Sequence, residues 1–171
     1  MPQSIRNKLL RTLPAVLAVT FLALLTGCQS LSFSVVGKTV SPGNWIPLKE
    51  SGTEVSYWQT RDLTLTYNYE RNQNTLKLNG TVDFAPSLRN NFTYIEYFHI
   101  AVLFLDSQGK ILEMRGLLSS SAQPIDDSMD FRRMLTVPPG SQFIAFSYRG
   151  QARSSSDETG SSTYFWEYPI R

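Results

Sequence analysis

Residues 63–84, LTLTYNYERNQNTLKLNGTVDF, decide the fold class of this chain. Apolar or aromatic residues alternate with polar ones on both sides of the turn-forming residues 71–74. Because successive side chains of a strand point to opposite faces, this pattern is typical of strands with one buried and one wet face. The segment therefore predicts an antiparallel β-hairpin. Gly80 falls among the apolar positions, which indicates a bulge or a bulky neighbour packed over it.

Further strands are expected after the hairpin. Residues 94–105, YIEYFHIAVLFL, are apolar on both faces, as in a long central strand or a strand under a partner surface. No segment shows a sustained helical period, and turn residues separate the other expected strands, at 111–118, 129–137, 142–149 and 163–168, with a polar loop at 119–128. We therefore expect an all-β fold, an antiparallel two-sheet sandwich of about seven strands of immunoglobulin-like or transthyretin-like type. A closed small barrel is the alternative.

Length and composition limit the function classes. The 171 residues are 42% hydrophobic and 18% charged, which fits one globular domain. One Cys excludes an internal disulfide framework and a zinc site built on several Cys, and one His excludes a His-rich metal centre. Without its first 27 residues the chain has 13 basic and 14 acidic residues, a net charge of −1. Such a near-neutral total shows no electrostatic footprint for nucleic acid or for an anionic membrane surface.

Residues 1–27 are organised like an export signal. The basic residues Arg6, Lys8 and Arg11 precede an apolar stretch at 13–25. As a helix this stretch would span about 20 Å, too short for a hydrocarbon core of about 30 Å. The sequence Leu25-Thr26-Gly27-Cys28 then follows and matches the lipobox of bacterial lipoproteins. The leader therefore resembles that of a bacterial lipoprotein.

This resemblance implies a lipid anchor. Signal peptidase would recognise Leu25, Thr26 and Gly27, and Cys28 would become the N-terminus, with diacylglycerol on its sulfur and usually an N-acyl chain. Two or three acyl chains suffice for stable membrane anchoring. Gln29 lacks the Asp that retains lipoproteins in the inner membrane under the enterobacterial sorting rule. The expected location is therefore the outer membrane, facing the periplasm.

Three parts of the chain can be separated on these grounds. Residues 1–27 are the expected signal peptide. Residues 28–44 are rich in Ser, include Gly37, Pro42 and Gly43, show no sustained period, and predict a lipidated tether. Residues 45–171 are the expected β-sandwich domain.

One strand end of this domain distantly resembles a small immunoglobulin-like family whose strand reads Phe-x-Leu-Tyr-Asp. Asp106 and the following turn to Gly109 match the family. Val102, Phe104 and Leu105 differ from its three apolar letters. The resemblance implies the same sandwich class of fold.

The sequence offers few residues for catalysis or metal binding. His99 is the only candidate base for a nucleophile, and no Gly-x-Ser-x-Gly elbow accompanies it, which favours a packed or partly exposed strand residue. Asp126, Asp127 and Asp130 could supply oxygen ligands to Ca²⁺, but they lack the Gly-punctuated loop and distal Glu, so we expect a solvated turn. There is no phosphate-binding Gly loop or dinucleotide fingerprint. We expect no catalytic residue, metal site or cofactor.

The aromatic residues near the C-terminus can be interpreted either as a binding surface or as part of the core. Tyr164, Trp166 and Tyr168 share one face of the last expected strand. That face would offer a stacking platform for sugars or for a partner's strand. Alternatively it packs in the core with the Tyr hydroxyls reaching solvent, and composition favours this core position for Trp166. The same alternatives apply to Trp45 and Trp58.

Together these features predict a lipid-anchored periplasmic β-sandwich protein. We expect a non-enzymatic binding or assembly accessory of the cell envelope, with an envelope protein or glycan as partner and no nucleic acid. The alternative is an envelope enzyme, or a carbohydrate-binding module, with a pair of acids that the sequence does not reveal.

Overall fold

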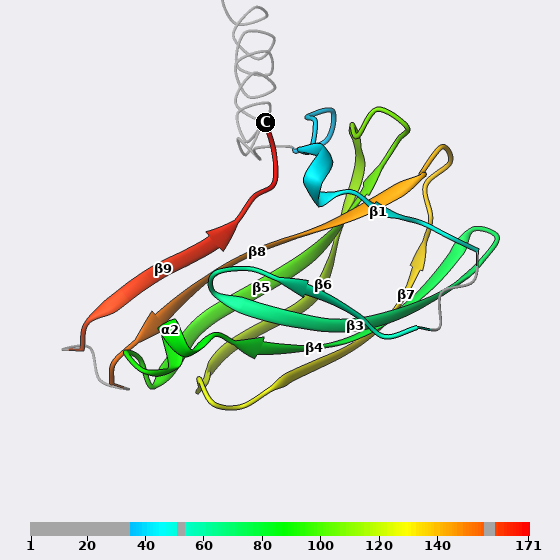
Figure 1. Ribbon diagram of the computed structural model, residues 1–171. Helices are drawn as coiled ribbons and strands as arrows, with labels where there is room; N and C mark the ends of the chain where they lie inside the picture. The colour runs from blue at the N-terminus through cyan, green and yellow to red at the C-terminus, as the bar shows by residue number, and fades with distance from the viewer. Residues whose placement is uncertain (1–34, 51–53, 156–159) are drawn as a thin grey trace, which may run out of the picture. The chain divides into compact units, whose positions relative to one another are not determined.

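The computed structural model describes residues 35–50, 54–155 and 160–171, and in these ranges the chain forms nine strands in two antiparallel sheets (Figure 1). The expected all-β sandwich is therefore confirmed, as two separate sheets rather than a closed barrel. Two short strands near the start of the domain raise the number above seven. The lipobox, Leu25 to Cys28, lies outside the described residues, so lipidation stays a prediction.

The first sheet is built around the predicted hairpin. Its four strands lie in the order β2 (Ser56–Gln59), β3 (Leu63–Asn72), β4 (Thr75–Phe84) and β7 (Met129–Thr136). The hairpin is in register from Leu63 opposite Phe84 to Asn72 opposite Thr75. A bulky neighbour does cover Gly80, since a Cβ there would lie 2.7 Å from the ring of Phe131.

The second sheet is centred on the long apolar strand. Its strands are β1 (Ile46–Pro47), β5 (Tyr94–Leu105), β6 (Ile111–Pro124), β8 (Phe143–Arg153) and β9 (Ser162–Glu167). β5 pairs with β6 on one side and β8 on the other, while β1 and β9 both pair with the far side of β8. β6 continues to Pro124, so the loop expected at 119–128 is wrong for most of its length.

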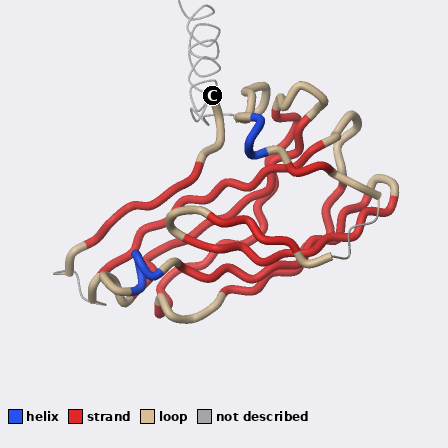
Figure 2. The backbone as a smooth tube through the Cα atoms, in the orientation of Figure 1, coloured by secondary structure: helices blue, strands red, loops and turns tan. Residues whose placement is uncertain are grey.

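In the part of the chain that the structure describes, helical structure is confined to two short segments, the 3₁₀ turn η1 (Pro42–Asn44) and α2 (Pro86–Arg89), as Figure 2 shows. A proline begins each of them, at a position where its missing N–H costs no hydrogen bond. Within the described ranges, neither is long or apolar enough to cross a membrane.

The two apolar faces of β5 are buried by different parts of the chain. Phe98, Ile100 and Val102 point into the main core between the sheets. Leu103 and Leu105 lie on the outer face and belong to a second cluster with Val40, Ile111 and Ala145, against which Val35, Trp45 and Ile170 pack. The surface expected over this strand is therefore supplied by the chain's own ends. Ile95 joins the main core because a register shift against β8 follows it.

The expected tether ends earlier than residue 44. Val40 is fully buried, pairs with Ile170, and the compact unit begins at Val35. Thr39 also bridges to Lys110. These contacts are long-range in sequence, so a segment without any period gave no local signal of them. The boundary at 44 is corrected to 34, and the sandwich domain begins at Val35.

Candidate binding surfaces

β9 is an edge strand of the five-stranded sheet. It pairs with β8 from Ser162 opposite Arg153 to Glu167 opposite Tyr148, and no other described strand pairs with it. Figure 1 shows β9 at the margin of the ribbon. Because main-chain groups alternate in direction along an antiparallel ladder, every second residue of β9 turns its N–H and C=O away from β8. An unpaired row of this kind is a template for a partner.

Tyr164, Trp166 and Tyr168 form what we call the aromatic stripe. Their side chains are 60%, 58% and 45% exposed on the outer face of the sheet. Phe165 points the other way, is 1% exposed, and packs its ring against that of Phe84. The core position favoured for Trp166 is therefore wrong. Alternation determines which residues share a face, but it does not determine which face is buried. The space between the sheets accommodates the ring of Phe165, so the residues that alternate with it lie on the outer face.

Trp45 and Trp58 are both packed against neighbouring rings. Trp58 contacts Phe146, with ring centroids 5.5 Å apart, and is partly buried at the main core. The indole N–H of Trp45 donates a hydrogen bond to the carbonyl of Val40, 3.0 Å away. Its ring occupies the space beside Gly109, where a Cβ would lie 2.1 Å from it. Neither residue extends the aromatic stripe.

Polar side chains continue the outer face next to the stripe. The register places Trp166 beside Arg149, Arg149 beside His99, and His99 beside Ser119. Directly paired residues lie on the same face, with Cβ atoms about 4.5–5.5 Å apart. The rings of His99 and Tyr97 also contact each other, with centroids 5.8 Å apart. The stripe is thus the border of a wider surface that carries a cation and an imidazole.

His99 and Ser119 form the closest arrangement to a nucleophile and base. His99 Nδ1 lies 2.8 Å from the hydroxyl of Ser119. In serine hydrolases a third group orients the base, and amide groups stabilise the oxyanion. In the described part of the chain, no carboxylate is hydrogen-bonded to His99. The pair is partly exposed on regular strands, as expected for a strand histidine with one hydrogen bond.

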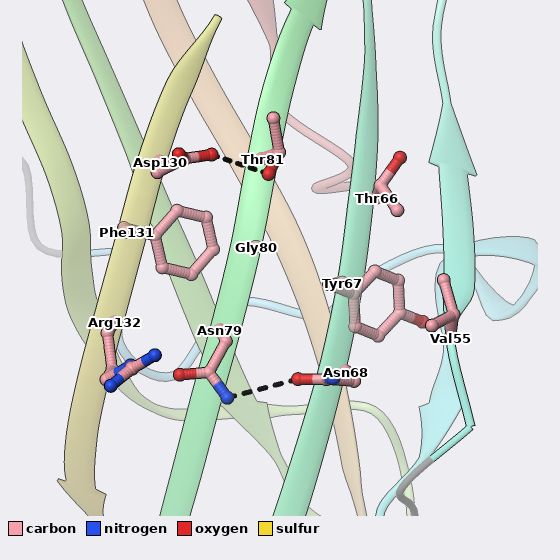
Figure 3. Close-up of a pocket in the computed structure, with 10 residues that line it drawn as sticks. All are labelled: Val55, Thr66, Tyr67, Asn68, Asn79, Gly80, Thr81, Asp130, Phe131 and Arg132. Carbon is pink, nitrogen blue, oxygen red and sulfur yellow. Dashed lines mark hydrogen bonds between the residues drawn. The ribbon is translucent and has the colours of Figure 1, made fainter.

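A shallow groove of about 430 Å³ crosses the outer face of the four-stranded sheet (Figure 3). The volume is in the range of small-ligand pockets, roughly 300–1,000 Å³. Its polar lining comes from three neighbouring strands, β3, β4 and β7, and consists of Thr66, Asn68, Asn79, Thr81, Asp130 and Arg132. Tyr67 and Phe131, in the row between these polar residues, also line it, but their side chains are buried in the main core.

The register explains why these side chains converge. Asn68, Asn79 and Arg132 lie in one row across the sheet, and Thr81 is directly opposite Asp130 in the next row. The amide of Asn79 donates to the side-chain oxygen of Asn68 at 3.1 Å, and Thr81 donates to Asp130 at 2.6 Å. Arg132 is exposed, and no described side chain forms an ion pair or hydrogen bond with it. The groove therefore presents one guanidinium and one carboxylate, which form no ion pair with each other, among amides and hydroxyls.

Sequence reasoning missed this groove for a physical reason. Most of its polar residues occupy the solvent-facing positions of the alternating pattern in the hairpin. Such positions give the same sequence pattern whether the outer face of the sheet is flat or grooved. A useful signal is the pairing of Asn68 with Asn79, because like amides at matched distances from a hairpin turn are cross-strand neighbours.

The acids considered for metal binding do not come together. Asp126 and Asp127 are exposed, while Asp130 accepts the hydrogen bond from Thr81 in the groove. Across the described ranges, no group of three His, Cys, Asp or Glu side chains is placed to hold a metal ion.

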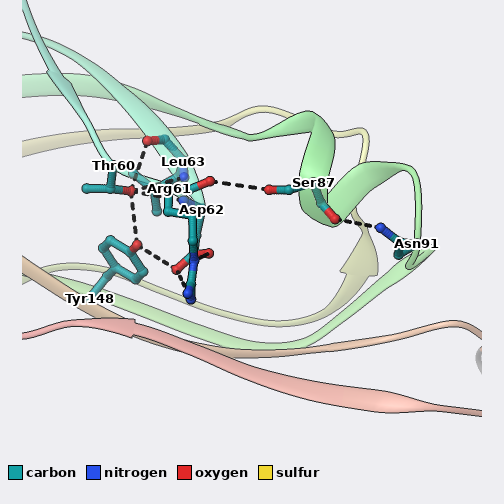
Figure 4. Close-up of polar contacts among 7 residues, drawn as sticks. All are labelled: Thr60, Arg61, Asp62, Leu63, Ser87, Asn91 and Tyr148. Atoms are coloured by element: carbon teal, nitrogen blue, oxygen red, sulfur yellow. Dashed lines mark hydrogen bonds and ion pairs between the residues drawn. The ribbon is translucent and has the colours of Figure 1, made fainter.

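Asp62 is the one buried acid of the described residues, and it lies between the sheets (Figure 4). Tyr148 on β8 donates to its carboxylate at 2.9 Å, and the Thr60 hydroxyl lies 2.9 Å from the same phenol oxygen. The exposed Arg61 forms an ion pair with Asp62, with 3.0 Å between Nε and Oδ1. Burial, together with the neighbouring Asp62, raises the pKa of Tyr148 well above its ordinary value. This network joins the β2–β3 turn to the other sheet and is structural.

No known protein family matches this chain, and a comparison with curated proteins also finds no match.

Proposed function

We propose that this chain is a lipid-anchored periplasmic protein that acts as a non-enzymatic binding or assembly accessory of the bacterial cell envelope. The leader and the sequence Leu25-Thr26-Gly27-Cys28 support the anchor. The sorting rule applied to Gln29 supports the outer membrane. No nucleic acid partner and no cofactor are part of this proposal.

The observation that carries a binding role is the polar groove on the four-stranded sheet. A concave site with a few convergent polar groups is the usual form of a ligand site. Asn68 and Asn79 bond to each other through one donor and one acceptor, which leaves further donors and acceptors for a ligand. The free guanidinium of Arg132 suits a carboxylate or phosphate, which it can hold with two hydrogen bonds. An envelope protein segment or a glycan carries such groups.

Photo-crosslinking from the groove tests this function. A photoreactive amino acid at Asn79 in intact bacteria should give a discrete adduct with an envelope component. The matched control is Met134, which is 71% exposed on β7 of the same sheet but does not line the groove. Arg132→Ala should reduce the Asn79 adduct and leave the unfolding midpoint unchanged. No adduct from Asn79, or equal adducts from both positions, would overturn the groove as the binding site.

A second candidate function is hydrolysis through His99 and Ser119, because their side chains lie 2.8 Å apart. A serine activated by this histidine should react with a fluorophosphonate probe. Ser119→Ala should abolish the labelling, with Ser121→Ala on the same strand as the control. Absence of labelling on the wild-type protein excludes an activated Ser119 and favours the non-enzymatic function.

A further inference from the structure

The exposed apolar side chains are unevenly distributed over the two sheets. Eight large hydrophobic residues are exposed in the described ranges. Five of them lie on the outer face of the five-stranded sheet or in the entry turn, residues 35–38, that packs over that face: Val36, Met114, Tyr164, Trp166 and Tyr168. Tyr164, Trp166 and Tyr168 adjoin one another along one strand, whereas Met114 lies on β6, on the other side of β8 and β5. Contiguous exposed apolar surface marks sites that contact another molecule or a membrane.

The chain enters the domain on this same face. Val35 packs against the cluster of Leu103 and Leu105, which are outer-face residues of β5. Tyr97 and His99 continue that face along β5, and the register places it beside the aromatic stripe. The described domain therefore begins, at Val35, on the side of the sandwich that carries the stripe.

Covalent geometry keeps this side close to any lipid on Cys28. Seven Cα steps separate Cys28 from Val35 and span at most about 25 Å. Val40 pairs with Ile170, so the entry segment meets the chain just after β9. At about 3.4 Å per residue, Trp166 lies about 14 Å along the chain from that bridge. A domain anchored through Cys28 can thus bring the aromatic stripe to the bilayer without breaking any contact of the described residues.

Charge on this side suits anionic phospholipid. Lys38, Lys110 and Arg149 are exposed, and no described side chain forms an ion pair with them. The carboxylate of Asp106 accepts hydrogen bonds from two main-chain N–H groups of its own turn, and Glu96 forms an ion pair with an arginine of β8. Lys38, Lys110 and Arg149 therefore outnumber the one described carboxylate here without a cationic partner, that of Asp106, which keeps its negative charge. Lys and Arg near a membrane are attracted by anionic lipid headgroups.

We propose that the aromatic stripe and the entry turn seat the outer face of the five-stranded sheet on the phospholipid surface that holds the lipid on Cys28. Trp and Tyr favour the headgroup level of a bilayer, where the ring is half desolvated and its polar group stays wet. The anchor keeps the domain at the surface, so the stripe acts at high effective concentration. This inference rests on the lipid anchoring of the proposed function. With the five-stranded sheet seated on the membrane, the groove on the outer face of the four-stranded sheet faces away from the membrane.

Tryptophan fluorescence of the processed, lipidated protein, which begins at Cys28, tests the inference. The protein is reconstituted in vesicles of phosphatidylethanolamine and phosphatidylglycerol, with or without phospholipid brominated near the top of its acyl chains. Bromine should quench the emission of Trp166 and iodide in the water should not. Trp166→Phe should lose the bromine quenching, whereas the control Trp58→Phe should keep it, because Trp58 packs against the core.

The basic residues give a second measurement. The double variant Lys38→Glu, Lys110→Glu should show less bromine quenching in these vesicles and an unchanged unfolding midpoint. Equal quenching in the double variant contradicts a role for the two lysines.

The outcomes separate this inference from the proposed function. If the protein floats with the vesicles but Trp166 stays accessible to iodide and unquenched by bromine, the membrane contact is overturned and the anchor stands. The same holds if Trp166 becomes protected only after a soluble envelope protein or glycan fraction is added, which would make the stripe a partner site. If the protein does not associate with vesicles, the anchor itself is wrong, and the inference falls with it.

Discussion

Phe165 and Trp166 are neighbours in β9 with opposite environments. Phe165 contributes to the main core and also lies against Gly150, whereas Trp166 is 58% exposed. The period-2 pattern correctly predicts that Tyr164, Trp166 and Tyr168 share a face. It does not predict that this face is the outer one, because the other face also carries an aromatic ring, that of Phe165. The choice depends on the ring-sized space offered by Phe84 and Phe98, which no local pattern reveals.

This contrast gives a stability prediction. Trp166→Ala should change the free energy of unfolding by no more than about 0.5 kcal/mol, as surface substitutions do. Phe165→Ala should cost about 3–5 kcal/mol, because it leaves a cavity among packed rings. Chemical unfolding of both variants measures the difference. A loss for Trp166→Ala as large as that for Phe165→Ala would show that Trp166 is core after all.

Tyr148 gives a prediction about alkaline pH. Burial raises its pKa in the folded protein, while in the unfolded chain it titrates near its ordinary value of about 10. Its contribution to stability is therefore complete below about pH 10 and is lost as the pH rises further, because only the unfolded state then releases the proton. Burial also raises the pKa of Tyr67, which acts in the same direction.

Tyr148→Phe should alter both the level and the pH dependence of stability. At neutral pH it should cost about 1–3 kcal/mol, since Asp62 and Thr60 lose a hydrogen-bond partner inside the protein. Above about pH 10 its stability should fall less steeply than that of the wild type, because one buried phenol is gone. Urea unfolding across this range is the measurement. An unchanged alkaline slope would mean that Tyr148 is not the group that titrates.

At the scale of the element, β5 and β9 show what patterning can predict. The run at 94–105 correctly indicates a central strand, and the outer face of this strand is covered where Leu103 and Leu105 lie. The run does not identify the cover, which is formed by residues near Val35 and Ile170, far apart in sequence. The groove is hidden in the same way, because Asn79 and Arg132 meet only through the pairing of β4 with β7. Local period predicts strands, while pairing between distant strands creates the surfaces.

The pairing of β8 with β9 depends on a glycine. Gly150 lies directly opposite Phe165, and a Cβ at Gly150 would be 2.4 Å from the Phe165 ring. Gly150→Ala should therefore destabilise the fold by about 1–3 kcal/mol through overpacking. Gly116→Ala is the matched control, because nothing lies within 4 Å of its added Cβ. That control should be neutral or stabilising by up to about 1 kcal/mol, since Ala restricts the unfolded chain.

A double variant identifies the cause. Phe165→Leu removes the ring, so Gly150→Ala should cost less in that background than in the wild type. Additive effects of the two substitutions in unfolding measurements would contradict a direct clash.

At the scale of the whole molecule, the sandwich separates two surfaces of different character. The outer face of one sheet carries the aromatic stripe and the entry of the chain, and the outer face of the other carries the polar groove. Net charge gave no sign of this division. A total of −1 for the chain after residue 27 is consistent with any arrangement, and the fold gathers Lys38 and Lys110 beside one bridge. The distribution of charged side chains between the two outer faces follows from the fold and not from the net charge.

The lipid anchor on which this arrangement depends is tested by Cys28→Ser. The thiol is the nucleophile that takes up diacylglycerol, and a hydroxyl at this position is a much weaker one. The variant should therefore lack lipid and remain a precursor that retains residues 1–27 with Arg6, Lys8 and Arg11. Intact mass and labelling with radioactive palmitate measure both changes. Gln29→Asp serves as the matched control, because it should keep lipid and processing but move the protein to the inner membrane. If Cys28→Ser is still cut before residue 28 and fractionates with the outer membrane, the protein does not use a lipid on Cys28, and its aromatic stripe has no tether to hold it at a bilayer.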